Sequence, residues 1–383
     1  MAMTDEERHL LATERMSRFR FGLGNRGIND NDNRSFRERL QHKYESEVAR
    51  CPVDIGTART GTERRGNMTK LRDYVMNGTI ILGVDAGYGN FKTARTCFPT
   101  CIRRSEKEPA VSGDYLELNG AYYTLEDGHK DFVADKNEDE DNYVLTLVAV
   151  AKELNARGLD KARIHLAVGL PLKWVQTQRE EFRKYMLQNK HVEFFYRRKK
   201  YVVDIVDSTV MPQCYAAIAE NLKNFTGMNM VADIGNGTMN IMILNNGKAS
   251  DSKSWTVKMG VNQCFQKIRN LVSARLSKDL QPEIIEHYLR FGDTMIGSSY
   301  GAVMEEAAKE YSEEIFAELR EHGYDPELMK LYMMGGGAQI IERVGEYDRN
   351  TVTFDHDIRA NAKGYEYFCY LKLRKQAREN SRR

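Results

Sequence analysis

Long hydrophobic runs are missing from this sequence of 383 residues. The longest predominantly apolar stretch, residues 144–151, has the size of a buried core element, whereas a membrane-spanning helix needs roughly 18 apolar residues. The first residues, MAMTDEER, are acidic and contain no apolar segment of the kind found in secretory signals. We therefore expect a cytoplasmic protein with no membrane partner.

An excess of charge of either sign is missing as well. Lysine and arginine together number 57, and aspartate and glutamate 55, which leaves a net charge of +2. A chain this close to neutral has no bulk electrostatic attraction to nucleic acid, so we expect no direct sequence-specific contact with it.

Signatures of metal sites and of common nucleotide sites are also scarce. Among six scattered cysteines only Cys97 and Cys101 lie close in sequence, with no second Cys/His pair at ligand spacing and no HExxH segment. We expect reduced, mostly buried thiols, with a metal site as the weaker alternative. The patterns GxxxxGK[ST] and GxGxxG do not occur, which argues against a P-loop or Rossmann site.

Residues 1–76 differ in composition from the rest of the chain. Residues 21–35 and 57–67 are rich in glycine, asparagine and other polar residues, and residues 35–49 have the apolar spacing of a short charged helix. Such a composition buries too little apolar surface to form a core. We expect a disordered or loosely structured extension, with a regulatory or partner-binding arm as the alternative.

From Thr79 onward the pattern is that of a mixed α/β protein. Strands are predicted at residues 79–85, 115–118, 121–125, 163–168, 201–206, 230–234, 240–244 and 332–334. Helices are predicted at 143–156, 212–222 and 338–344, and they dominate from 261 to 328. The strand–turn–strand units at 80–96 and 231–243 look like one motif used twice, which predicts two related domains with a cleft between them. We place domain I at 77–216, rejoined by 355–383, and domain II at 217–354.

The first of these units contains the segment Asp85-Ala86-Gly87-Tyr88-Gly89-Asn90-Phe91-Lys92. Gly87 and Gly89 let backbone N–H groups converge on an anion with no Cβ in the way. Lys92 adds a charge that can reach bridging phosphate oxygens, and Asp85 is expected to hold a hydrated Mg²⁺ ion. The nucleotide-binding candidates here are Gly87, Tyr88, Gly89, Asn90 and Lys92. A tight hairpin without a ligand is the alternative for this segment alone.

The second unit has a similar residue pattern in the segment Asp233-Ile234-Gly235-Asn236-Gly237-Thr238-Met239-Asn240. Asp233 again ends a buried strand, glycines form the turn after it, and Thr238 adds a hydroxyl donor. Two such loops facing each other would clamp a polyphosphate from opposite sides, and a coincidental pair is far less frequent than a single match. The binding candidates here are Gly235, Asn236, Gly237 and Thr238, with Asp233 as a second Mg²⁺ carboxylate acting through water.

A third glycine-rich segment comes after the strand at 332–334. Gly335, Gly336 and Gly337 let the backbone approach a flat ring or a ribose, and the helix behind them offers free N–H groups near Gln339. A βα turn without a ligand is the alternative.

Taken in order, the three segments resemble the phosphate-1, phosphate-2 and adenosine motifs of the actin, sugar kinase and chaperone ATPase superfamily. Further segments resemble ParM-like and StbA-like plasmid-segregation actins: VGLPL at 168–172, the acidic lead into a helix at 135–154, and ANAKGY at 360–365. The resemblance covers about residues 78–373 and none of the first 76.

The resemblance implies an actin-like fold, with two duplicated RNase H-like α/β domains flanking a nucleotide cleft. It implies an ATPase that binds Mg-ATP or Mg-GTP and forms filaments that segregate plasmid or mobile-element DNA through a DNA-bound adaptor protein. Carried over onto this chain, Gln213 orients the attacking water, with Asp233 and Asp85 as the other catalytic candidates. Gln263 and Lys267 are candidates for contacts with the adenine base. Asn240 departs from the family pattern, which often has an acid there.

Two other functions on the same fold compete with the filament-forming ATPase. A non-polymerising small-molecule kinase would need a sugar-recognition loop after the first phosphate loop, and residues 95–104 continue instead as a strand-like run. A chaperone-type ATPase would need a substrate-binding domain, for which the basic residues after Leu373 leave no room. We expect that basic segment to be a solvated helix end, with a weak DNA or partner contact as the alternative.

Overall fold

The computed structural model describes residues 70–110, 113–126, 140–293 and 297–382. Nearly all of the predicted extension over 1–76, including its short helix at 35–49, lies outside these residues. The acidic residues 135–139 lie outside them too.

The described part of the chain alternates strands and helices. Its strands are β1 (Val75–Met76), β2 (Thr79–Ala86), β3 (Asn90–Thr93), β4 (Cys97–Pro99), β5 (Ile102–Ser105), β6 (Tyr115–Leu118), β7 (Ala121–Leu125), β8 (Lys161–Leu170), β9 (His191–Tyr196), β10 (Lys199–Pro212), β11 (Met228–Ile234), β12 (Met239–Asn245), β13 (Lys248–Val257), β14 (Lys330–Met334) and β15 (Val352–Phe354). Its helices are α3 (Glu140–Ala156), α4 (Val175–Met186), α5 (Tyr215–Ile218), the 3₁₀ helix η1 (Ala219–Asn224), α6 (Val261–Leu276), α7 (Pro282–Phe291), α8 (Ser298–Glu321), α9 (Gly336–Val344) and α10 (Ala360–Asn380).

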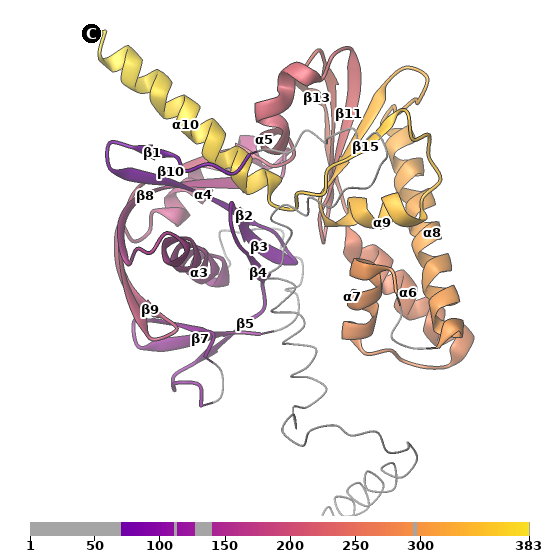
Figure 1. Ribbon diagram of the computed structural model, residues 1–383, viewed down its shortest axis with the longest axis horizontal. Helices are drawn as coiled ribbons and strands as arrows, with labels where there is room; N and C mark the ends of the chain where they lie inside the picture. The colour runs from indigo at the N-terminus through magenta and orange to yellow at the C-terminus, as the bar shows by residue number, and fades with distance from the viewer. Residues whose placement is uncertain (1–69, 111–112, 127–139, 294–296, 383) are drawn as a thin grey trace, which may run out of the picture. The chain divides into compact units, whose positions relative to one another are not determined.

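The first sheet has the strand order β4-β3-β2-β8-β10-β9-β6-β7-β5, with β1 paired to β2. Its centre is parallel, because β8 pairs in parallel with both β2 and β10, and the flanking pairs are antiparallel. Figure 1 shows α3 inside the curve of this sheet and α10 on its other side.

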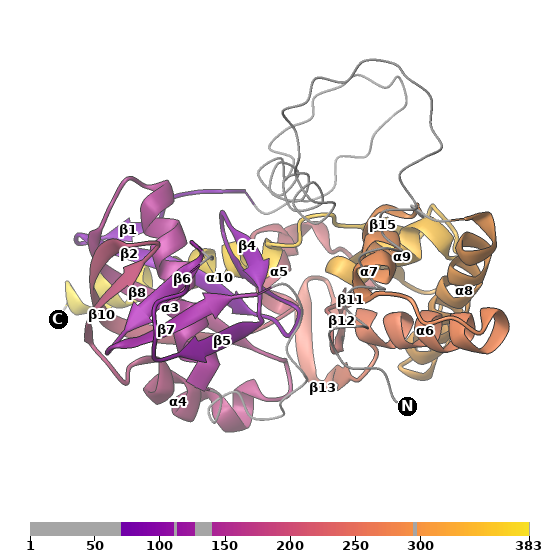
Figure 2. The same ribbon diagram turned by 90° about the horizontal axis from the view of Figure 1, so that it is seen from below.

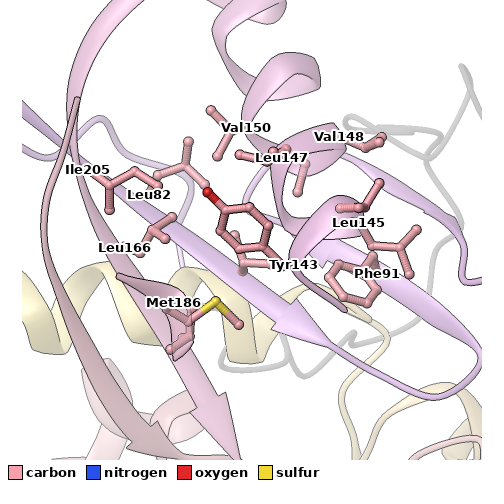
Figure 3. Close-up of a cluster of buried hydrophobic side chains, with 14 of the residues drawn as sticks. Leu82, Phe91, Tyr143, Leu145, Leu147, Val148, Val150, Leu166, Met186 and Ile205 are labelled. Carbon is pink, nitrogen blue, oxygen red and sulfur yellow. The ribbon is translucent and has the colours of Figure 1, made fainter. Parts of the chain in front are cut away.

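Alternating side chains explain why both faces of the first sheet are covered. On β2, Leu82 and Val84 join the core beneath α3, whereas Ile81 joins a second cluster with Tyr365 and Cys369 of α10. Successive side chains of a strand point to opposite faces, so a continuously apolar strand is buried between two layers. Figure 3 shows the ring of Tyr143, from α3, among these core side chains.

The second sheet has the order β13-β12-β11-β14-β15 and repeats this plan. Met230, Ala232 and Ile234 of β11 face the core formed with α6, α7, α8 and α9, whereas Val231 faces a smaller cluster that includes Ile218 of α5. Figures 1 and 2 show these four helices gathered together beside the sheet. Both sheets thus contain an antiparallel hairpin, β2–β3 or β11–β12, next to a parallel neighbour.

Most predicted elements are present, with bounds that shift by a few residues. The helix predicted over 212–222 is wrong in its first part: β10 runs on to Pro212, which pairs with Leu170 of β8, and a short helix starts only at Tyr215. Pairing with the neighbouring strand overrides the local helical pattern here, and Cys214 turns the chain with a φ of 67°.

Three features of the described residues concern the expectations about membrane spans, thiols and metal sites. None of the described helices is long and apolar enough to cross a membrane. Cys214, Cys264 and Cys369 are buried as expected, whereas Cys97 and Cys101 are only half-buried. In the described part of the chain no three His, Cys, Asp or Glu side chains gather as a metal-binding group.

Candidate functional site

The first loop joins β2 to β3. Asp85 is the last but one residue of β2 and pairs across the hairpin with Lys92. A Cβ on Gly87 would lie 2.7 Å from the carbonyl oxygen of Asn90, so the turn requires glycine there. Thr100, which is buried, donates from Oγ1 to the carbonyl oxygen of Tyr88 at 2.7 Å and so fixes the loop from behind.

Asp85 itself is buried and makes two polar contacts. Gln213 Nε2 donates a hydrogen bond to Asp85 Oδ1 at 2.9 Å, and Lys92 Nζ lies 3.5 Å from Asp85 Oδ2. Burial alone would lower the pKa of Lys92, but the charges of Asp85, Cys97 and Asp233 outweigh it and raise that pKa. The lysine therefore stays charged beside the carboxylate.

The second loop joins β11 to β12 in the same register. Asp233 pairs across the hairpin with Asn240, as Asp85 does with Lys92, and the Gly235 N–H donates to the Thr238 carbonyl oxygen at 2.9 Å. The Val261 N–H, in the first turn of α6, donates to the Gly235 carbonyl oxygen at 3.0 Å. The loop is thus tied to a helix N-terminus.

Asp233 is buried with little compensation for its charge. Burial raises the pKa of Asp233 to about 6, and the nearby Asp85 charge adds to that rise, while Asn361 and Lys92 oppose it. Asn361 Nδ2 donates to Asp233 Oδ2 at 2.8 Å, and Asn361 Oδ1 accepts the Cys214 N–H at 2.9 Å. The first turn of α10 therefore bridges the second loop and the end of β10.

The third glycine segment lies directly against the second loop. Gly335 has a φ of +85°, and a Cβ there would lie 2.7 Å from Asp233 Oδ1. A Cβ on Gly337 would lie 2.2 Å from Ile234 Cγ2. These two glycines permit the close approach, whereas Gly336 is exposed and Gln339, on α9, is half-buried.

The two phosphate-loop candidates also meet each other. A Cβ on Gly89 would lie 2.8 Å from the Asn236 Cβ, so only a glycine fits at that point of the first loop. The structure thus brings together six predicted site residues, namely Asp85, Gly89, Lys92, Gln213, Asp233 and Asn236.

One face of α6 forms an open pocket of about 550 Å³. It is lined by Gln263, Gln266, Lys267, Asn270, Leu271 and Ala274, so the two adenine-side candidates share it. Lys267 Nζ is held by Glu314 at 2.9 Å and Glu310 at 3.2 Å. Gln263 Oε1 is buried and has no donor among the described residues.

The sequence did not single out Asn361 or Thr100. Asn361 lies in the ANAKGY segment, where an amide between two alanines at the start of a buried helical turn was the available signal. Thr100 had no signal, because its role depends on the chain returning to the loop after β4.

Both halves of the chain match families of actin-like domains. The N-terminal domain of actin-like proteins matches residues 83–215, and the C-terminal domain of archaeal MreB-like actin homologues matches residues 231–345. The chain belongs to the actin-like proteins. Its predicted fold and its predicted relationship to actin homologues are therefore confirmed. No curated protein sequence matches this actin-like protein.

Solved structures of other actin homologues have a fold similar to that of this chain. The archaeal actin homologue Ta0583 is 17% identical with a TM-score of 0.61, over 76% of this chain and 98% of that chain, and has also been crystallised with ADP. Apo psk41 ParM is 18% identical with a TM-score of 0.58, over 78% and 99% of the two chains. The Alp12 filament subunit is 17% identical with a TM-score of 0.57, over 78% and 100%.

Proposed function

We propose that this actin-like protein binds a Mg²⁺–nucleoside triphosphate at its two hairpin loops, hydrolyses it, and assembles into filaments that segregate DNA. The observation that carries the proposal is the pair of buried carboxylates, Asp85 and Asp233, at equivalent places in two equivalent hairpins. The ADP complex of Ta0583 supports an adenine nucleotide, and the Alp12 filament supports self-association.

The residues present fit a hydrated divalent cation. Asp233 has a raised pKa because its negative charge is buried and lies near a second carboxylate, and a cation would relieve that cost. Asp85 and Asp233 would hold such an ion through water, and it would supply positive charge to neutralise charge developing on the phosphates. Lys92 adds a fixed positive charge on the side of the first loop.

The remaining assignments rest on the same geometry. Backbone N–H groups of Tyr88–Asn90 and of Asn236–Thr238 hold the phosphates, with Gly237 as a turn residue and the Thr238 hydroxyl as a donor. Gly87 and Gly235 shape the two turns, because their own N–H groups donate to the carbonyl oxygens of Asp85 and Thr238. Gln213 orients the attacking water by hydrogen bonding. The segment Gly335–Gly337 with Gln339 contacts the ribose or base, and Gln263 and Lys267 contact the base from α6.

The larger biological assignments rest on the resemblance to ParM-like actins. We propose domain I at 77–216 with 355–383 and domain II at 217–354, a cytoplasmic protein, and a DNA-bound adaptor in place of direct DNA contact. The near-neutral net charge of +2 agrees with indirect attachment.

Three measurements on the full chain test the proposal: nucleotide binding, phosphate release, and 90° light scattering with ATP and Mg²⁺. Asp233→Ala should greatly slow turnover, and Gln213→Ala should slow hydrolysis by about a hundredfold while sparing binding. Asp279→Ala, whose side chain is 72% exposed, is the matched control and should change neither.

Each part of the proposal can fail separately. Unchanged hydrolysis in Asp233→Ala would remove that residue from the site. Binding and hydrolysis without scattering or filaments at tens of micromolar protein would contradict the segregation role and favour a non-polymerising kinase or ATPase.

A further inference from the structure

The buried carboxylate of Asp233 is held by a side-chain amide that has no part in the proposed hydrolysis. Asn361 Nδ2 donates to Asp233 Oδ2 at 2.8 Å, and among the residues that the structure describes no other side chain donates to this carboxylate. Asp85, at the equivalent place in the first loop, is contacted by both Lys92 and Gln213. Asp233 therefore depends on a single donor.

Asn361 is the counterpart of Gln213 in the second half of the chain. Each of these two amides follows the carboxylate that it contacts by the same 128 residues. The positions three residues after them also meet, because a Cβ on Gly364 would overlap the carbonyl oxygen of Ala216. The duplication that produced two acid-bearing loops thus also produced two amide-bearing segments, and one amide contacts each carboxylate.

A backbone group determines which way the Asn361 amide points. The Cys214 N–H donates to Asn361 Oδ1 at 2.9 Å, and a backbone N–H can only donate, so the amide oxygen must face it. The amide NH₂ group then faces Asp233, which is an acceptor. Asn361 is buried, so both contacts are shielded from water and strengthened.

The other oxygen of Asp233 is confined by the third glycine segment. A Cβ on Gly335 would lie 2.7 Å from Asp233 Oδ1, so the carboxylate is enclosed between Gly335 and Asn361. Its neighbour across the hairpin, Asn240, is neutral, whereas the first loop has a lysine at that place. Loss of Asn361 would free the Asp233 side chain to turn and leave a buried carboxylate without its donor.

We propose that Asn361 is a positioning residue, which holds the Asp233 carboxylate in the orientation that binds the hydrated Mg²⁺ ion of the nucleotide complex. The inference rests on the proposed function, because it concerns the same metal–nucleotide site. Groups that hydrogen-bond the side chains around a metal orient them, and their removal typically lowers metal affinity or activity about 10- to 100-fold. Asn361 contacts neither the ion nor the nucleotide, and its effect passes through Asp233.

The test compares the affinity of the full chain for ADP in excess Mg²⁺ and in EDTA, measured by titration calorimetry. In Asn361→Ala the Kd for ADP in Mg²⁺ should rise about tenfold, whereas the Kd in EDTA should change less than about twofold. An equal rise in both conditions, or no rise in either, overturns the inference, because a residue needed only for the fold would weaken both states alike.

Asn361→Leu is the second variant, because leucine fills most of the volume that alanine leaves empty. It should give the same selective loss of affinity in Mg²⁺. Failure of both variants to fold would show a structural role and overturn the inference.

Asn229→Ala is the matched control. Asn229 is a buried asparagine near the start of β11, the strand that carries Asp233, and its Nδ2 donates to the Thr226 carbonyl oxygen at 3.0 Å. The change also removes a buried amide but should leave both ADP affinities unchanged. A loss in Mg²⁺ equal to that of Asn361→Ala would mean a general loosening of β11 and would overturn the specific role of Asn361.

A double variant shows whether Asn361 acts through Asp233. In an Asp233→Ala background there is no carboxylate to hold, so adding Asn361→Ala should weaken ADP binding in Mg²⁺ no further. Losses that multiply overturn the inference while leaving the proposed function intact. A wild-type protein that binds ADP no more tightly in Mg²⁺ than in EDTA contradicts the proposed Mg²⁺ site, and this inference with it.

Discussion

The protonation state of Asp233 should affect the proposed binding of a metal–nucleotide complex. Burial raises the pKa of its carboxyl group to about 6. A carboxylate must lose its proton to hold a cation, directly or through water, so protons and Mg²⁺ compete at this residue.

We predict that Mg-nucleotide affinity falls as pH drops through about 6, by about tenfold per pH unit below the pKa of Asp233. Titration calorimetry between pH 5 and pH 8 measures it. Asp233→Asn provides the reference, because the nucleotide's own titration is common to both proteins. If the two proteins show parallel pH profiles, Asp233 does not couple protons to binding.

The residues of this site differ in how far the sequence could predict them. The acids Asp85 and Asp233 stand beside glycines in a repeated motif, so local pattern alone singled them out. Asn361 donates to Asp233 from 128 residues away. Its position between two alanines marks it as a buried amide, but nothing local indicates which residue it contacts. The roles proposed for these residues remain predictions. The contacts between them could be identified only from the folded structure.

At the scale of elements, β2 has a gap in its hydrogen-bond ladder. On one edge β1 pairs with Thr79 and Ile80, and β3 pairs only from Val84 onward. The Gly83 N–H, which lies in the gap, donates to Glu366 Oε1 of α10 at 3.0 Å. A Cβ on Gly83 would lie 2.1 Å from the Ala362 carbonyl oxygen, so glycine lets α10 approach the strand.

This contact makes stability depend on pH. Burial, with the nearby Glu153 carboxylate, raises the pKa of Glu366 from 4.5 to about 8. The folded protein keeps this proton between those values and the unfolded chain does not. The free energy of unfolding should therefore fall with rising pH, by about 1.4 kcal/mol per pH unit from this group, until the pH passes the folded-state value.

We predict that Glu366→Gln removes this slope. Relative to the wild type, the variant should gain stability as pH rises from 5 to about 8, with no further gain above that value. Urea unfolding at a series of pH values measures the difference, and Glu313→Gln, an exposed change on α8, is the control. A difference between Glu366→Gln and wild type that is independent of pH would show that Glu366 is already ionised in the folded protein.

The elements that the sequence predicted best are those whose pattern reflects burial on both faces. The largely apolar β2, β11 and β14 were predicted in their buried parts, at 79–85, 230–234 and 332–334, and each strand extends one or two residues further. Residues 207–211 of β10 were assigned to no element and Pro212 was placed in a helix, because the extended form of this part of the strand depends on its pairing with β8 up to Leu170. The strand β9, with alternating exposed residues, was not predicted, although its pattern is that of a half-covered strand.

At the scale of the described molecule, the two sheets are joined by a short linker between β15 and α10. Tyr332 of β14 donates its hydroxyl hydrogen to Asp355 Oδ2 at 2.7 Å, which fixes the linker to the second sheet. Arg359 Nη1 donates to the Arg95 carbonyl oxygen at 3.1 Å, which fixes it to the turn between β3 and β4. Between them Lys363 Nζ lies 2.6 Å from Asp357 Oδ2, and both side chains are buried.

A buried ion pair of this kind has an asymmetric effect on stability. Removal of one partner leaves an uncompensated charge inside the protein and typically costs about 3–5 kcal/mol, whereas replacement of both by neutral groups is often close to neutral. We therefore predict that Lys363→Met lowers the free energy of unfolding by about 3 kcal/mol, and that Asp357→Asn together with Lys363→Met restores most of it.

Denaturant unfolding of the two variants decides between a buried and a solvated pair. Lys309→Met, which breaks an ion pair whose two side chains are each 54% exposed, is the control and should change stability far less than Lys363→Met. If Lys363→Met costs no more than this control, the charge of Asp357 is compensated without Lys363, by water or by Arg359, whose Nε lies 3.7 Å from Asp357 Oδ1. If instead the single change is costly and the double variant recovers, the linker depends on charge neutrality, and this connection between the two sheets should be stable only while Lys363 and Asp357 remain paired.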